Sequence, residues 1–215
     1  MEEGLLYHHR LNAKDIPSDI LEVYRYLGFP KPVAMASVYE ESEIVPKETV
    51  DLVKNCVFQM HEVLRPQALF QMFSLNTEFA EKLLESKDLA KRLENCSHVL
   101  LLAATIGPQV DAMVRRWTKL DTAKAAVAQS CGAMFMESYM DILVTQIEEQ
   151  AKESNFLLKP RYSAGYGDLP LDVQRLVFSV LPCTQKIGLT LTEYNLMLPE
   201  KSVTAFIGIE TKKSA

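Results

Sequence analysis

The sequence predicts an α+β fold, a mainly antiparallel twisted sheet with helices packed against it. Three apolar, strand-like segments bounded by turn residues indicate the sheet: Val57–Phe73, Val99–Ile106 and Val203–Ile209. Segments with helical spacing separate them, and the longest runs from Asp121 to about Ser154. No internal repeat, long linker or low-complexity tract divides the chain, so its 215 residues are predicted to form one domain, 1–215.

The N-terminal part, residues 1–95, is predicted to combine helices with a hairpin. Four helices are predicted there: Ile20–Leu27, a segment that starts near Pro46 and includes Cys56, Thr77–Leu84 and Ser86–Leu93. Between the second and third of these, residues alternate loosely from Val57 to Leu64. Arg65-Pro66-Gln67 then interrupts the pattern, so we interpret Val57–Phe73 as two strands joined by a turn.

The remaining part, residues 96–215, is predicted to begin with a buried strand that leads into a helix from Pro108 to Trp117. A strand that ends in glycine before a helix invites a phosphate-binding interpretation. Gly107 stands alone, however, and lacks the G-x-G-x-x-G pattern of a dinucleotide site. The last predicted elements are a helix over Leu171–Leu181 and a hairpin that pairs Glu193–Leu198 with Val203–Ile209 across a turn at Pro199–Ser202.

Composition and charge argue against several classes of protein. The chain is 48% hydrophobic and 24% charged, which predicts a proper core and no disordered or fibrous bias. The formal net charge of −5, with no Lys/Arg-rich block, argues against binding to nucleic acid. The longest apolar run, Val99–Ile106, falls short of the roughly 20 residues of a membrane span. The start, Met1-Glu2-Glu3, lacks the basic segment of a signal peptide, so we expect a cytoplasmic protein without membrane association.

Cysteine and histidine form no recognisable metal or catalytic motif. We expect four reduced, mostly buried thiols, because no C-x-x-C pair is present: Cys56, Cys96, Cys131 and Cys183. His8 and His9 are expected at the surface. His61 could be a metal ligand or a hydrogen-bonded histidine of the sheet, and no other ligand at metal spacing accompanies it. No Ser/His/Asp or Cys/His constellation supports a hydrolase, and we assign neither a metal site nor a catalytic residue.

The stretch Arg161–Pro170 has the composition of a ligand-binding loop. It holds two of the eight glycines of the chain, and glycine is favoured where something must approach the backbone closely. Tyr162 and Tyr166 supply flat apolar faces with polar tips, and Arg161 supplies a fork that matches a carboxylate. Such a set suits a small ligand that bears an amino-acid group. The alternative is a plain loop that precedes a helix.

The long predicted helix carries a carboxylate among apolar neighbours. Ala133, Met140 and Val144 surround Glu137 at helical spacing. A carboxylate in such a setting must find a partner or shift its pKa. Glu137 is therefore either one member of a structural ion pair or an acid that faces a ligand.

The order of motifs in the last quarter of the chain resembles the activation domain of cobalamin-dependent methionine synthase. That family has an R-x-x-x-G-Y-P signature, a following helix, an I-G-x-x-L-T-E segment and a P-x-x-S-V hairpin. The matching residues here are Arg161-x-x-x-Gly165-Tyr166, the helix Leu171–Leu181, Ile187-Gly188-x-x-Leu191-Thr192-Glu193 and Pro199-x-x-Ser202-Val203. The apolar run that ends in Thr105-Ile106-Gly107 also resembles the corresponding segment of the family, which ends in Thr-x-Gly.

The resemblance implies a function in methionine biosynthesis. Activation domains bind S-adenosylmethionine and present its methyl group to cobalamin that has been oxidised to cob(II)alamin, while a flavodoxin-type donor supplies an electron. The resemblance implies that residues 96–215 bind the ligand and that Arg161 holds its carboxylate. It further implies contacts from Tyr162, Ala164, Gly165 and Tyr166, and it places Glu137 and Glu193 toward the positively charged part of the ligand.

The chain lacks the other modules of a methionine synthase. No histidine lies in the D-x-H-x-x-G setting that ligates cobalt, and there is no room for the homocysteine or folate barrels. We therefore expect a free-standing activation subunit of a methyltransferase system, which acts on a cobalamin-carrying synthase subunit or another corrinoid protein. The alternative is a non-catalytic regulatory protein with the same fold that senses S-adenosylmethionine or a corrinoid partner.

Three positions depart from the pattern of the family. Gly167 replaces the proline after Gly-Tyr, and Gly28 falls where the family has an early aspartate ligand. A Tyr-Tyr pair beyond the hairpin has no counterpart before Ala215. These departures predict weak ligand affinity or affinity that depends on a partner.

Overall fold

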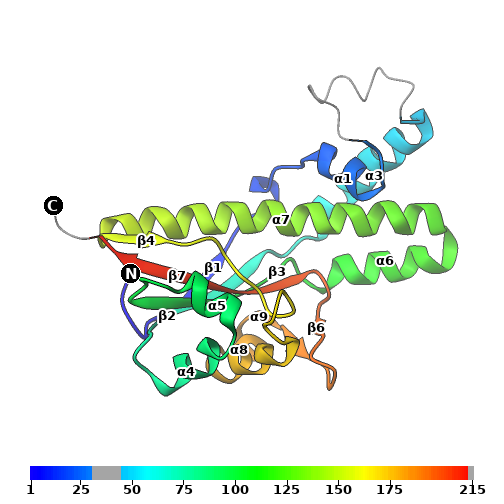
Figure 1. Cartoon of the computed structure of the whole chain (residues 1–215). Coiled ribbons are helices and arrows are strands. Elements are labelled where there is room, and N and C mark those ends of the chain that lie inside the picture. Colours follow the sequence, from blue (N-terminus) through cyan, green and yellow to red (C-terminus); the bar gives the residue numbers. More distant parts are fainter. Residues whose placement is uncertain (31–44, 213–215) are drawn as a thin grey trace. The chain divides into compact units, whose positions relative to one another are not determined.

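The computed structural model describes residues 1–30 and 45–212 (Figure 1). Its contacts divide the chain into two compact units, each built from segments that are distant in sequence. The sheet unit comprises Met1–Arg10, Gln67–Thr105 and Ile142–Ala215, and the helical unit comprises Leu11–Pro66 and Ile106–Asp141. The prediction of one domain over residues 1–215 stays a prediction.

The sheet unit is organised around a five-stranded antiparallel sheet with strand order β1-β2-β3-β7-β4. Its strands are β1 (Leu6–Arg10), β2 (Gln67–Ser74), β3 (His98–Thr105), β4 (Phe156–Leu158) and β7 (Ser202–Thr211). The central strand β3 is apolar along nearly its whole length because both of its faces are covered. The predicted α+β fold with a mainly antiparallel sheet is confirmed.

Short helices cover one face of this sheet and the C-terminal part of α7 lies on the other (Figure 1). The short helices are α4 (Glu78–Leu84), α5 (Lys87–Arg92), α8 (Gln174–Val180, preceded by the 3-10 turn Leu171–Val173) and α9 (Cys183–Ile187). Leu101 and Phe206, which are partners on β3 and β7, pack into the buried cluster beneath these helices. On the opposite face, Nε2 of His9 lies 2.8 Å from Oε1 of Gln146 on α7.

The helical unit contains α1 (Ile20–Tyr26), α3 (Lys47–Val63), α6 (Pro108–Leu120) and residues 122–141 of α7 (Thr122–Glu153). Asp19 caps α1 through the N–H groups of Leu21 and Glu22. Gly107 precedes α6 with a φ of +93°, and a Cβ there would lie 3.0 Å from Cβ of Arg65. Glycine is therefore needed at position 107, where two backbone segments approach each other. This close approach explains the glycine without a phosphate-binding role.

The prediction of two strands over Val57–Phe73 is wrong for its first half. Residues up to Val63 continue α3, and only Gln67–Ser74 forms a strand. The buried residues Val50, Val53, Val57, Met60 and Leu64 recur every three or four positions, which is the period of a helix. Phe58, which the alternation placed in a strand, is 70% exposed on the outer face of the helix. The loose alternation fits both periods, and the helix that forms gathers Val53, Val57 and Met60 on its buried face.

His61 accordingly lies on a helix and not in a sheet. Its Nε2 is 2.8 Å from Oγ of Ser18, its Nδ1 is 3.2 Å from the carbonyl oxygen of Ala13, and its ring meets the edge of Phe135 at 4.7 Å. The expectation of a hydrogen-bonded histidine is confirmed, and its placement in a strand was wrong.

The predicted hairpin between Glu193–Leu198 and Val203–Ile209 does not form. β6 (Met197–Leu198) pairs with β5 (Thr190–Leu191) in a separate two-stranded sheet. β7 has β3 on one edge and β4 on the other, so both of its edges are already occupied. β1 and β4 were not predicted, because β1 is short and polar and β4 has only three residues.

The other predicted elements match the structure within a few residues. Helices near 20–27, 77–84, 86–93, 108–117, 121–154 and 171–181 are present, as is the strand near 99–106. Over the part of the chain that the structure describes, no helix has the length and apolar character required to cross a membrane.

Candidate functional site

The Arg161–Pro170 loop leaves the sheet at the edge formed by β4. The N–H of Lys159 donates to the carbonyl of Gly208 on β7 at 2.8 Å. Tyr162 and Phe206 then exchange two backbone hydrogen bonds, of 2.9 and 2.7 Å. The backbone on both sides of Arg161 is therefore fixed to β7, and Arg161 itself is half-buried.

The loop closes on itself through its own backbone. The N–H of Gly165 donates to the carbonyl of Leu169 at 2.8 Å, and the N–H of Leu169 donates to the carbonyl of Tyr166 at 3.0 Å. The hydroxyl of Tyr162 also donates to that carbonyl of Tyr166, at 2.9 Å. These hydrogen bonds hold the loop in one conformation. The loop would therefore lose little conformational entropy if a ligand bound to it.

The two glycines of the loop have different roles. Gly165 has a φ of +87° and is exposed, and a Cβ there would meet only Cδ1 of Leu171, at 3.4 Å. Its backbone is thus open to close approach. Gly167 has a φ of +54°, and a Cβ there would overlap Oδ2 of Asp88 and lie 2.5 Å from the hydroxyl of Tyr162. Proline, which requires a φ near −65°, cannot take this conformation, so the departure from the Gly-Tyr-Pro signature has a structural cause.

Asp168 connects the loop to α5. Its carboxylate accepts hydrogen bonds from the hydroxyl of Ser86 and from the N–H groups of Lys87, at 2.8 Å, and Asp88, at 3.2 Å. Ser86 is the N-cap of α5, so Asp168 satisfies donors at the start of that helix. These hydrogen bonds, led by the one from Ser86, lower the pKa of Asp168. In return, the N–H of Asp168 donates to Asp88 at 3.3 Å.

The two tyrosines of the loop divide into a buried one and an exposed one. Tyr162 is 9% exposed, and the guanidinium of Arg92 lies 4.4 Å from its ring centroid. Loss of solvent, followed by the nearby charge of Asp88, raises the pKa of the Tyr162 phenol. Tyr166 is 66% exposed, and its ring is tilted by 50° from that of Tyr162 at 6.4 Å. An aromatic face is therefore held at the surface by a buried ring beneath the loop.

The structure brings five of the predicted ligand-binding residues together in this loop. Arg161 is half-buried, Tyr162 and Ala164 are buried, and Gly165 and Tyr166 are exposed. Their role in binding stays a prediction, and the structure does not choose between a ligand loop and a plain loop.

The two predicted glutamates lie elsewhere. Glu193 is exposed in the turn between β5 and β6, where Nη2 of Arg175 donates to its carbonyl at 2.9 Å. Glu137 is half-buried on α7 and belongs to the helical unit. For Glu137, the ion-pair and ligand-facing interpretations both stay open.

Sequence reasoning missed Asp88, Arg92 and Asp168, which support the loop. Asp88 and Asp168 are 80 residues apart, so no local spacing could reveal their contact. The only local signal was Ser86, whose position before a short apolar-periodic run is typical of an N-cap. It indicated the start of a helix and not the loop that joins it.

A small hollow adjoins the base of the loop. It has a volume of about 250 Å³ and is lined by Lys91, Arg92, Glu94, Asn95, Lys159 and Pro160. Its cations are partly compensated, because Lys159 forms an ion pair with Glu210 and Arg92 lies over the Tyr162 ring.

The histidines of the described ranges contact other protein groups, and some of these contacts join residues that are distant in sequence. Nδ1 of His98 lies 2.8 Å from Oγ of Ser97, and Nε2 of His8 accepts from Arg10 at 3.3 Å. The four cysteines are free thiols, and three of them are buried. In residues 1–30 and 45–212, no three His, Cys, Asp or Glu side chains come together to hold a metal ion.

Comparison with known proteins supports the fold class that the motifs implied. No protein-family model matches the chain, and no curated protein matches its sequence. The sheet and its covering helices have the fold of a methionine synthase reactivation domain. The solved structure described as the MetH reactivation domain bound to AdoHcy matches with a TM-score of 0.70 and 14% identity, over 99% of this chain and 81% of that chain. The structural resemblance to the activation domain family is confirmed.

Proposed function

We propose that this chain binds S-adenosylmethionine and supports the reductive methylation of cob(II)alamin carried by a separate methionine synthase subunit or corrinoid protein. One observation carries the proposal: the fold of a reactivation domain extends over 99% of the chain, and the Arg161-x-x-x-Gly165-Tyr166 motif lies in a pre-shaped loop on that fold. That solved domain is bound to AdoHcy, the product that S-adenosylmethionine leaves after it loses its methyl group.

The loop residues suit this ligand by their chemistry. The Arg161 guanidinium matches the carboxylate of the methionine part with two parallel N–H groups. The exposed backbone of Gly165 allows close approach, and the exposed ring of Tyr166 offers a flat apolar face. Gly167 faces Asp88 and Tyr162 within the protein, so its part is to shape the loop and not to contact the ligand.

The chain contributes position and no catalytic base. The sulfonium of S-adenosylmethionine is already an activated methyl donor, so no side chain has to be deprotonated. In the overall reaction one electron from a flavodoxin-type donor would reduce the partner's cob(II)alamin, and transfer of the methyl group from sulfur to the corrinoid would give methylcobalamin and release S-adenosylhomocysteine. Holding the methyl group in line with its acceptor is a problem of orientation, which a rigid loop reduces.

The alternative is a non-catalytic regulatory or binding protein with the same fold that senses S-adenosylmethionine or a corrinoid partner and performs no methyl transfer. One observation favours it. Gly28, which falls where the family has an aspartate ligand, ends α1 with a φ of +88°, and its N–H donates to the carbonyl of Arg25 at 3.0 Å. It serves as a helix terminator and offers no carboxylate.

Titration calorimetry with S-adenosylmethionine tests ligand binding. We expect Arg161→Ala to weaken the affinity roughly tenfold or more, because a charge-assisted hydrogen bond contributes about 1.5–3 kcal/mol. Arg161→Lys keeps the charge but loses the fork, so it should fall between the wild type and Arg161→Ala. Arg10→Ala, which removes an exposed arginine of β1, is the matched control and should bind as the wild type does. Equal affinity in wild type and Arg161→Ala would remove Arg161 from the site.

The partner requirement has its own test. We expect the purified chain alone to retain no corrinoid through gel filtration, since cobalamin belongs to the partner. Copurification of a corrinoid with the isolated chain would contradict this assignment.

A further inference from the structure

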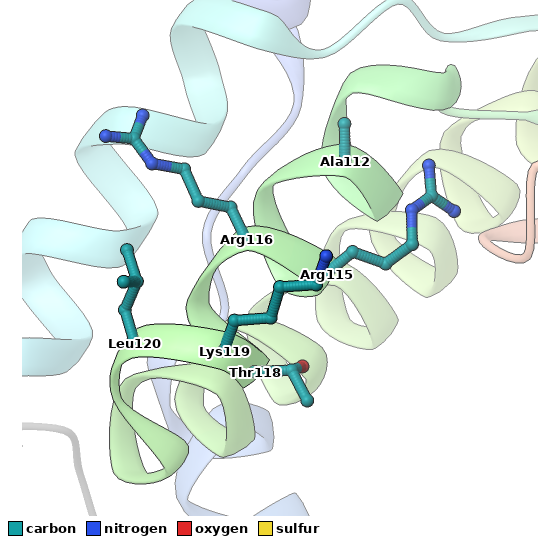
Figure 2. Close-up of a pocket in the computed structure, with 6 residues that line it drawn as sticks. All are labelled: Ala112, Arg115, Arg116, Thr118, Lys119 and Leu120. Carbon is teal, nitrogen blue, oxygen red and sulfur yellow. The ribbon is translucent and has the colours of Figure 1, made fainter.

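The exposed face of α6 carries a group of three cations. Arg115, Arg116 and Lys119 are all exposed, and none of their side chains forms an ion pair or hydrogen bond with another residue of the described ranges. We define the α6 surface as these three cations together with Ala112, Thr118 and Leu120 (Figure 2). Asp121, the next residue along the chain, is engaged elsewhere, because it accepts from the N–H of Lys124 at 3.0 Å.

Two hollows meet along this surface. One of about 630 Å³ is lined, among described residues, by the six members of the α6 surface. The other, of about 250 Å³, lies between α3 and α6 and is lined by Gln59, Val63, Gln109, Ala112, Met113, Arg116 and Trp117. Ala112 and Arg116 belong to both. The surface is therefore extended, and it combines charge with apolar contact area.

The α6 surface contributes little to the stability of the chain itself. Leu120 leaves 72% of its surface in water, and cations without partners give the fold no ion-pair energy. Such a combination of arginines and an exposed apolar side chain is typical of protein interfaces. The α6 surface is positively charged, whereas the chain as a whole has a net charge of −5. An anionic partner is therefore attracted to this surface although the chain as a whole repels it.

We propose that the α6 surface is a docking site for the acidic face of a partner protein. The directions of the side chains favour a macromolecular partner over a small anion. Arg115 and Arg116 extend to opposite sides of α6, with Lys119 between them (Figure 2), so the three charges do not converge on one phosphate or carboxylate. The carboxylates of a protein surface can meet them separately, and Leu120, which lies on the same side as Arg116 (Figure 2), can contact an apolar spot of that surface. This proposal does not depend on the binding of S-adenosylmethionine.

The chain has a built-in reporter for this surface. Trp117 is its single tryptophan and lines the hollow between α3 and α6. The Nζ of Lys124 lies 4.4 Å from the centroid of the Trp117 ring. A ligand that settles on the α6 surface should therefore change tryptophan fluorescence.

The test uses poly-L-glutamate as a mimic of an acidic protein surface. We expect a saturable change in Trp117 fluorescence that weakens as salt rises. The triple variant R115E/R116E/K119E should bind at least tenfold more weakly. K14E/K82E/K186E changes the net charge equally at three exposed lysines elsewhere, and it should bind within about threefold of the wild type. Circular dichroism checks folding, and R115Q/K119Q provides a milder variant that should show an intermediate loss.

Several outcomes would overturn the proposal. Equal losses in the two triple variants would mean that bulk charge alone drives binding. Tighter α6-dependent binding of inorganic phosphate would identify a small-anion site, and α6-dependent binding to phosphatidylserine vesicles would identify a membrane surface. Salt-sensitive self-association that the triple variant abolishes would identify a second copy of this chain as the occupant.

Discussion

A pair of glycine-to-alanine substitutions measures how tightly the candidate loop is held. Gly167 and Gly188 both have positive φ, +54° and +64°. They differ in their surroundings, because a Cβ at Gly167 would overlap Oδ2 of Asp88 whereas a Cβ at Gly188 meets nothing within 4 Å. Gly188→Ala thus reports the conformational cost alone, and Gly167→Ala reports that cost together with the displaced contacts.

The expected sizes follow from these surroundings. A positive φ costs an alanine about 1–2 kcal/mol, so Gly188→Ala should lower the free energy of unfolding by about that amount. Gly167→Ala adds an overpacking cost of about 1–3 kcal/mol, because the new methyl group displaces Asp88 and the Tyr162 hydroxyl. Gly167→Pro, which would restore the residue of the family signature, should disturb the loop at least as much, since its φ is incompatible.

Urea denaturation and calorimetry provide the two measurements. The midpoints, at unchanged slope, give the stability difference between the variants. Because Arg161 and Tyr166 belong to the same closed loop, Gly167→Ala should also weaken S-adenosylmethionine binding, and Gly188→Ala should not. Equal stability losses in the two variants would refute the contacts of Gly167. Unchanged ligand affinity in Gly167→Ala would refute the link between loop shape and binding.

Two further predictions test the surroundings of the loop and the core. Because the pKa of Asp168 is lowered in the folded state, its contribution to stability is complete above the ordinary aspartate pKa of 3.8 and is lost as pH falls through the lower folded value. When the free energy of unfolding is measured as a function of pH, Asp168→Asn should therefore lack the part of the acid-induced loss of stability that Asp168 causes. An acid profile identical to that of the wild type would contradict the capping role of Asp168. Burial raises the pKa of Cys56 to about 11 and that of Cys183 to about 12, whereas Cys96 is partly exposed. A thiol reagent at pH 8 should therefore modify Cys96 first and the other cysteines only on unfolding. Rapid reaction of a second thiol in the native protein would contradict the burial of the other cysteines.

The fold class could be predicted because the strongest signals are local. The apolar run at β3 and the long stretch of helical periodicity at α7 each identify an element without any knowledge of its partners. Strand pairing is different, since it depends on which edges remain free. The segment around Met197 is followed by a turn and a strand, and this order predicted a hairpin with β7. The edge of β7 is instead occupied by β4, which is distant in the sequence. β4 has only three residues, which are too few to show the alternating pattern of a strand.

The candidate loop could be located from its composition, but its architecture could not. Arginine, glycine and tyrosine between Arg161 and Gly167 are visible in the sequence. The close approach of Asp88 to Gly167, the cap that Asp168 supplies to α5 and the contact of Arg92 with the Tyr162 ring all involve residues about 70 to 80 positions earlier in the chain. The sequence presented Gly167 as a departure from a motif. The contacts show that glycine is the residue that fits there.

The most direct test of the proposed function is a reactivation assay with a cobalamin-carrying synthase held as cob(II)alamin. With reductant, S-adenosylmethionine and this chain, we expect the absorption spectrum of methylcobalamin to return, and without the chain we expect the oxidised spectrum to persist. Tyr166→Ala should slow the recovery more than Glu200→Ala, which alters an exposed residue outside the loop. A mixture that stays oxidised with several corrinoid partners, although the chain binds S-adenosylmethionine, would contradict reactivation and favour the regulatory alternative.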